Sequence, residues 1–173
     1  MKKHLLTFMA FLSIPFFSLR AQNKPLETVG KVDLQKYLGK WYEIAAFPQI
    51  FEKGCTCTIA QYSLKSNGDI TVKNTCKRNG KITTANGRAV VKDKTTNAKL
   101  SVSFFWPFSG KYWIIALAPD YSYAMVGHPN RKYLWILSRK PKMDEATYHH
   151  LTALAASKGF DLKKLVTTDQ SCN

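Results

Sequence analysis

The chain has 173 residues, of which 45% are hydrophobic and 13% aromatic. This length is typical of one globular domain, and the apolar content is too high for a disordered chain. Lysine and arginine outnumber aspartate and glutamate by 26 to 11, which gives a formal net charge of +15. A positive charge of this size favours anionic partners, such as lipid head groups.

The N-terminus has the pattern of a secretory signal peptide. A short basic start precedes an apolar run over residues 5–19 and the small residue Ala21. A membrane span needs roughly 20 apolar residues, so this run is too short for one. We expect residues 1–21 to be cleaved, leaving one domain over 22–173 with 23 cationic and 11 anionic residues, a net charge of about +12. Because no cysteine precedes Cys55, we expect a soluble periplasmic or secreted protein without a lipid anchor.

Four cysteines, at positions 55, 57, 76 and 172, lie in the expected mature chain. In an oxidising compartment an even number of cysteines predicts disulfide bonds, here two. Cys55 and Cys57 are separated by one residue and cannot easily bond to each other, which leaves two possible pairings. The C-x-C spacing lacks the C-x-x-C pattern of zinc sites, so we expect no metal.

From residue 40 the chain has short β segments separated by turns. Asn67-Gly68 between two alternating runs is typical of a β-hairpin, and another turn is expected at Pro107–Gly110. The expected strands cover residues 40–47, 58–64, 70–75, 81–91, 99–105, 111–118, 122–126 and 132–138. An up-and-down antiparallel meander of eight strands can close into a barrel that holds one small ligand. The predicted fold class is therefore all-β, an eight-stranded barrel.

The hydrophobic period changes near the C-terminus. Asp144 is a good helix N-cap, and apolar residues then recur at helical spacing until Gly159. We expect one helix here, packed against the outside of the barrel.

Three segments carry a resemblance to a known family. Residues 33–44 contain Gly39-Lys40-Trp41, residues 120–121 are Asp-Tyr, and residues 133–139 read YLWILSR. In this order, on an eight-strand meander followed by one helix, they resemble the lipocalins, and in particular the bacterial outer-membrane lipocalin and apolipoprotein D-like subgroup. The resemblance implies structural roles for Gly39, Trp41 and Arg139, with the arginine over the tryptophan ring.

The resemblance also implies a disulfide pattern and a ligand-binding interior. It implies the bonds Cys57–Cys172 and Cys55–Cys76. The period-two pattern, together with the resemblance, predicts an inner wall formed by Ala60, Tyr62, Val72, Asn74, Arg88, Phe104, Tyr112, Tyr123 and Trp135. The expected border of the mouth is formed by Phe47, Phe51, Trp106 and Phe108.

Within this wall, Tyr62, Asn74 and Arg88 are expected to orient a lipid head group. We therefore expect an exported carrier of small hydrophobic ligands, fatty acids or lysophospholipids, that serves envelope maintenance and contacts anionic membrane surfaces peripherally.

The sequence has no recognised catalytic motif, and we expect neither enzymatic activity nor a cofactor. Adjacent His149 and His150 point to different faces of a helix and cannot chelate together. Two alternatives remain: an enzyme that acts on a lipid through a cavity thiol such as Cys76, and a haem- or pigment-binding lipocalin. The chain has no recognised nucleic-acid-binding motif, and its expected export argues against nucleic-acid binding. The oligomeric state is not determined by the sequence.

Overall fold

The computed structural model describes residues 24–172, so the expected signal peptide at 1–21 lies outside the described residues. The strands are β1 (Gly39–Ala46), β2 (Thr56–Leu64), β3 (Ile70–Arg78), β4 (Lys81–Val91), β5 (Lys99–Phe105), β6 (Phe108–Leu117), β7 (Tyr123–Gly127), β8 (Leu134–Ser138) and β9 (Val166–Thr167). The α-helices are α1 (Leu34–Tyr37) and α2 (Glu145–Ser157), and the short 3-10 helices are η1 (Ile50–Glu52) and η2 (Leu162–Lys164).

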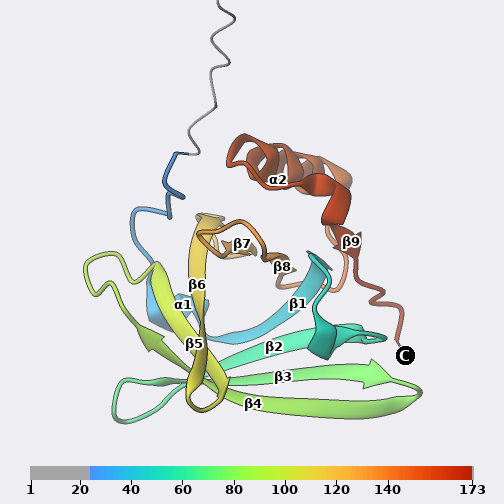
Figure 1. Cartoon of the computed structure of the whole chain (residues 1–173), viewed down its shortest axis with the longest axis horizontal. Coiled ribbons are helices and arrows are strands. Elements are labelled where there is room, and N and C mark those ends of the chain that lie inside the picture. The colour runs from blue at the N-terminus through green and yellow to red at the C-terminus, as the bar shows by residue number, and fades with distance from the viewer. Residues whose placement is uncertain (1–23, 173) are drawn as a thin grey trace, which may run out of the picture.

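Strands β1 to β8 form a closed antiparallel barrel (Figure 1). Each strand pairs with the next along the chain, and β1 pairs with both β2 and β8. The register places Trp41 opposite Ala60 on β2, and Ala46 opposite Trp135 on β8. The sheet thus closes on itself, which confirms the predicted fold.

One difference from the predicted strands is at the start of β6. A turn was expected at Pro107–Gly110, but β6 already begins at Phe108. Phe108 lies opposite Phe105, and Gly110 lies opposite Val102, so these residues form part of the β5–β6 ladder. The predicted turn was therefore too long, because glycine and proline were both taken as turn signals although Gly110 lies within a strand.

A ninth strand was not predicted. In β9, Thr167 lies opposite Ala45 and Val166 lies opposite Ala46. The first half of β1 pairs with β2 and its second half pairs with β9, so the C-terminal segment takes the place of β2 beside β1. A strand of two residues has no measurable periodicity, which explains why the sequence pattern did not reveal it.

Helix α2 covers the outside of the barrel beside β7, β8 and β1 (Figure 1). The Asp144 side chain caps it and accepts a hydrogen bond from the Thr147 backbone N–H at 2.8 Å. Gly159 follows the helix with φ 84°, the left-handed conformation that glycine adopts at helix ends. Leu151 and Ala155 are fully buried against the barrel, as the helical spacing predicted.

Two apolar clusters lie on the two faces of the sheet. Residues inside the barrel, such as Trp41, Val72 and Val126, form one cluster. Residues between the barrel and α2, such as Met125 and Leu151, form the other. Because successive strand residues point to opposite faces, neighbours such as Met125 and Val126 belong to different clusters.

Both disulfide bonds implied by the resemblance are present. Cys55 is bonded to Cys76 with a Cα–Cα distance of 5.5 Å, and Cys57 is bonded to Cys172 with a distance of 6.1 Å. The second bond ties the C-terminal segment to β2 across a sequence separation of 115 residues. The cavity-thiol alternative needs a free Cys76, and in this structure that sulfur is bonded.

None of the helices within residues 24–172 is long and apolar enough to cross a membrane.

Candidate binding site

Trp41 and Arg139 seal the closed end of the barrel. The guanidinium carbon of Arg139 lies 3.8 Å from the centroid of the Trp41 ring, a cation–π distance. Its Nη1 and Nη2 atoms donate hydrogen bonds to the carbonyls of Lys40 at 2.7 Å and Lys36 at 2.6 Å. Gly39 has φ 91°, a backbone conformation that favours glycine. This arrangement fits a structural role for all three signature residues.

Three tyrosines form the floor of the interior. The hydroxyl of Tyr112 lies 2.8 Å from that of Tyr37 on α1 and 2.9 Å from that of Tyr62 on β2. Burial raises the pKa of Tyr62 to about 12. Burial also raises the pKa of Tyr37 and Tyr112 well above the usual tyrosine value. The three hydroxyls therefore stay neutral at physiological pH and can both donate and accept hydrogen bonds.

Burial varies among the side chains of the inner cluster. Trp41, Val72 and Val126, which face inward, are fully buried or nearly so. Other residues pack against the same inner cluster yet are only half-buried, namely Ala60, Val102, Phe104, Tyr112 and Trp135. Inward-facing side chains that keep accessible surface indicate space beside them, as expected for a barrel that holds a ligand.

Two strand residues bury side-chain oxygens that can accept hydrogen bonds, Asn74 on β3 and Glu43 on β1. Asn74 lies opposite Ala60, and its Oδ1 atom is buried without a hydrogen-bond partner among residues 24–172. An unpaired buried acceptor costs about 1–3 kcal/mol, which a donor on a ligand would offset. Glu43 is buried two residues after Trp41, and its Oε1 accepts a hydrogen bond from the Thr168 hydroxyl at 2.6 Å. Burial raises the pKa of Glu43 above its usual value.

A second carboxyl group, that of Glu52 in η1, lies near Glu43. Burial, followed by the charge of Glu43, raises the pKa of Glu52 to about 8, although a hydrogen bond with the Trp135 side chain lowers it in part. At neutral pH this carboxyl group is therefore mostly protonated and can donate a hydrogen bond. Arg78 at the end of β3 donates from Nη2 to the Phe51 carbonyl at 2.5 Å, and this contact holds η1 beside β3.

Three of the predicted site residues do not face the interior. Arg88 points outward and forms an ion pair with Asp69, with a distance of 2.8 Å between Nε and Oδ2, because its neighbour Ala89 occupies the inward position. Tyr123 lies in the outer cluster for the same reason, since Ala124 faces inward.

The third misplaced residue, Phe47, is 2% exposed and packs against Phe160 beneath α2. A period-two count from Trp41 places Phe47 inward, but a β-bulge between Glu43 and Ala45 shifts the facing by one residue.

The other predicted residues lie where the pattern placed them. Ala60, Tyr62, Val72, Phe104, Tyr112 and Trp135 belong to or pack against the inner cluster, and Asn74 is on the same face of β3 as Val72. The expected border residues Phe51, Trp106 and Phe108 are exposed at the open end. Whether these residues bind a ligand remains a prediction.

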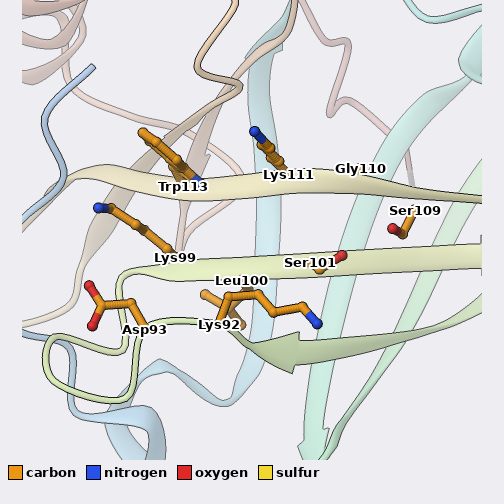
Figure 2. A pocket seen from close by; sticks show the side chains of 9 residues that line it. All are labelled: Lys92, Asp93, Lys99, Leu100, Ser101, Ser109, Gly110, Lys111 and Trp113. Atoms are coloured by element: carbon orange, nitrogen blue, oxygen red, sulfur yellow. The ribbon is translucent and has the colours of Figure 1, made fainter. Parts of the chain in front are cut away.

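A separate hollow of about 340 Å³ lies on the outer surface of β5 and β6 (Figure 2). Lys99, Lys111 and Trp113 line it, and the Lys99 ammonium group lies 4.9 Å from the centroid of the Trp113 ring. None of the predicted site residues borders this hollow. The barrel interior, which gathers seven of the predicted residues, is therefore the candidate binding site.

Comparison with known proteins identifies the family. The family described as "Lipocalin-like domain" matches residues 32–170. The chain belongs to this family. It is 40% identical over 144 residues to outer membrane lipoprotein Blc of Escherichia coli K12, covering 82% of this chain and 81% of that protein. It is 39% identical over 148 residues to bovine apolipoprotein D, covering 80% and 77%.

A solved structure shows the same fold. Insecticyanin from the tobacco hornworm superimposes with a TM-score of 0.68 and 25% identity, covering 83% of this chain and 84% of that chain. Lipocalins bind small hydrophobic ligands and are generally binding and transport proteins, so both the family and the inner wall support ligand binding. The resemblance to the Blc and apolipoprotein D subgroup is confirmed.

Sequence reasoning missed three polar residues of the interior. Glu43 is two residues after Trp41, so the period-two pattern could have revealed that it faces inward. Glu52 lies in an irregular segment that has no periodicity. Tyr37 lies in α1, whose N-cap Asp33 accepts a hydrogen bond from the Gln35 N–H at 2.9 Å. An aspartate before a helical turn is a sequence signal for a helix start, and it could have indicated α1.

Proposed function

We propose that this protein binds a lysophospholipid in the barrel interior and carries it after export, in the service of envelope maintenance. Fatty acids are expected to bind more weakly. The observation that carries this proposal is the inner wall itself, in which apolar side chains surround a small set of buried hydrogen-bonding groups.

The apolar wall supports binding of one acyl chain. Each buried methylene contributes about 0.8 kcal/mol, so an acyl chain of about fifteen methylenes contributes about 12 kcal/mol, of which about 8 kcal/mol remain after a binding cost of about 4 kcal/mol is subtracted. A free energy of this size corresponds to a Kd of about 1 μM. The tyrosine floor formed by Tyr37, Tyr62 and Tyr112 limits how deep the chain can reach.

The polar groups favour a head group that donates hydrogen bonds. Asn74 Oδ1 and the Glu43 carboxyl group are acceptors, and the glycerol hydroxyl and ammonium group of lysophosphatidylethanolamine are donors. An ionised fatty acid offers only acceptors. Because Arg88 points outward, it does not supply the inward cation that was expected to help orient a head group.

Export is supported by the cysteines as well as by the signal-like N-terminus. Two disulfide bonds join all four cysteines, which is typical of proteins from oxidising compartments.

Titration with lysophosphatidylethanolamine and with palmitate, followed by calorimetry, tests the proposal. We expect binding in the micromolar range for the first ligand and weaker binding for the second. Ala60→Trp fills the interior and should weaken binding by about tenfold or more, since at least one good apolar contact is lost. Gln61→Trp, on the outward face of the same strand, is the matched control and should bind as the wild type does. Equal effects of the two substitutions would contradict binding inside the barrel.

A further inference from the structure

The exposed apolar side chains of the protein gather at one end of the barrel. In an up-and-down barrel the connections β1–β2, β3–β4, β5–β6 and β7–β8 lie at the same end, which here is the end away from Trp41. Of the nine large hydrophobic residues that are exposed within residues 24–172, seven lie on or next to these four connections. They are Ile50, Phe51, Ile82, Phe105, Trp106, Phe108 and Tyr133.

The exposure of these residues is unusually large. Ile50 is 96% exposed, Trp106 is 92% exposed, and Phe105, Phe108 and Ile82 each exceed 70%. Removing apolar side chains from water lowers the free energy, so several exposed ones at one end of a molecule indicate an interaction surface. We call these seven residues the apolar rim. Because they lie on separate connections around the mouth, a single flat partner can contact several of them at once.

The charge at this end indicates the kind of partner. Counting each connection with its two flanking residues, the open end has five cations and one carboxyl group. The cations are Lys53, Arg78, Lys81, Arg131 and Lys132, and the carboxyl group is that of Glu52. The three connections at the closed end, counted in the same way, have four cations and three carboxylates, those of Asp69, Asp93 and Asp120. Arg139 and Lys140, which follow β8, add two cations at that end, so the open end differs in combining its cations with the apolar rim and with few carboxylates.

The single acidic group at the open end adds little negative charge. Glu52 is half-buried, and its raised pKa keeps it mostly protonated at neutral pH. Lys53, Lys81 and Lys132 are exposed beside the rim. Aromatic side chains flanked by lysines match a lipid bilayer with anionic head groups, which takes up the rings at its interface and attracts the ammonium groups.

We propose that the apolar rim docks the open end of the barrel onto an anionic lipid bilayer, with Trp106, Phe105 and Phe108 entering the interface. This docking would place the mouth directly against the membrane, so that a lipid can pass between bilayer and barrel without crossing water. The proposal concerns the outer surface and does not depend on the identity of the ligand inside.

Co-sedimentation of the full chain with vesicles tests the proposal. Vesicles of phosphatidylglycerol and phosphatidylcholine in equal amounts should bind the protein, and vesicles of phosphatidylcholine alone should bind it much less. Trp106→Ser should weaken binding by about tenfold, because one large apolar side chain no longer enters the interface. Leu64→Ser is the matched control, since Leu64 is 42% exposed at the closed end, and it should leave binding unchanged.

The electrostatic part is tested in the same assay. The double variant Lys81→Gln, Lys132→Gln should weaken binding by about fivefold per lysine at low salt, and the matched variant Lys94→Gln, Lys140→Gln at the closed end should not. The interior variant Ala60→Trp should still bind vesicles, which separates this proposal from the proposed function. Equal binding to both vesicle types, equal effects at the two ends, or a stable dimer that buries the rim and does not bind vesicles would overturn it.

Discussion

Arg139→Lys is the substitution that most directly tests how the closed end is sealed. Arg139 stacks on Trp41 and donates hydrogen bonds to three carbonyls, those of Lys36 at 2.6 Å, Lys40 at 2.7 Å and Tyr121 at 3.3 Å. A lysine keeps the positive charge, but its single ammonium group cannot replace the planar fork that reaches several carbonyls at once. The substitution therefore isolates geometry from charge.

The magnitude follows from the contacts that are lost. A hydrogen bond from a charged donor contributes about 1.5 kcal/mol at the lower end of its range, and two of the three are lost here. The ammonium group retains part of the cation–π contact, which in full contributes about 0.5–2 kcal/mol. We expect Arg139→Lys to reduce the free energy of unfolding by about 3 kcal/mol, measured as a lower urea midpoint at an unchanged slope.

Arg88→Lys is the matched control for this measurement. Arg88 also forms an ion pair, with Asp69, but its side chain is 59% exposed, and exposed pairs contribute about 0–1 kcal/mol. We expect a change below about 1 kcal/mol. If the two variants unfold within about 0.5 kcal/mol of each other, the reasoning about the carbonyl contacts of Arg139 is refuted.

Two further predictions concern the mouth and the contact with α2. Because the pKa of Glu52 is about 8 in the folded protein and about 4.3 when unfolded, the folded state keeps a proton that the unfolded state releases. The free energy of unfolding should therefore fall as the pH rises from about 4 to about 8. Glu52→Gln should reduce this pH dependence, measured by urea titrations at several pH values. If the free energy of unfolding of the variant changes with pH as that of the wild type does, the carboxyl group of Glu52 is not buried. A Cβ at Gly127 would lie 2.6 Å from the Phe160 ring. Gly127→Ala should therefore lower the free energy of unfolding by about 1–3 kcal/mol, seen as a lower melting temperature in thermal unfolding. Gly110→Ala is the control, because a Cβ at that position meets open space, and it should not lower the free energy of unfolding. Equal melting temperatures for these two variants would contradict the tight contact between β7 and Phe160.

The sequence alone was enough to predict the barrel because its signals are local. Turn residues such as Asn67-Gly68 separate alternating runs, and the period of two determines which face each run buries. The C-terminal helix was predicted equally well, since Asp144 and Gly159 mark its two ends. The short strand β9 was missed. Its two residues pair with the second half of β1, where β2 no longer lies beside β1, and this pairing depends on tertiary structure.

The candidate site was predicted less completely, and the reason is again physical. An error of one residue in the predicted register reverses the face on which a strand residue lies, and for this reason Arg88 and Tyr123 are outside the barrel. The β-bulge in β1 places Phe47 beneath α2. The period-two pattern places Glu43 on the inner face, but a carboxyl group was not expected in an apolar interior, and Glu52 lies in a segment without periodicity. Burial raises the pKa of both carboxyl groups, and the charge of Glu43 raises that of Glu52 further; both effects depend on tertiary structure.

A crystal structure of the protein with lysophosphatidylethanolamine tests the central claim most directly. We predict that the acyl chain lies inside the barrel against Phe104, Tyr112 and Trp135, with its head group toward Glu43 and Glu52. An interior filled by the protein's own side chains, with the lipid bound in the outer hollow on β5 and β6, would contradict it.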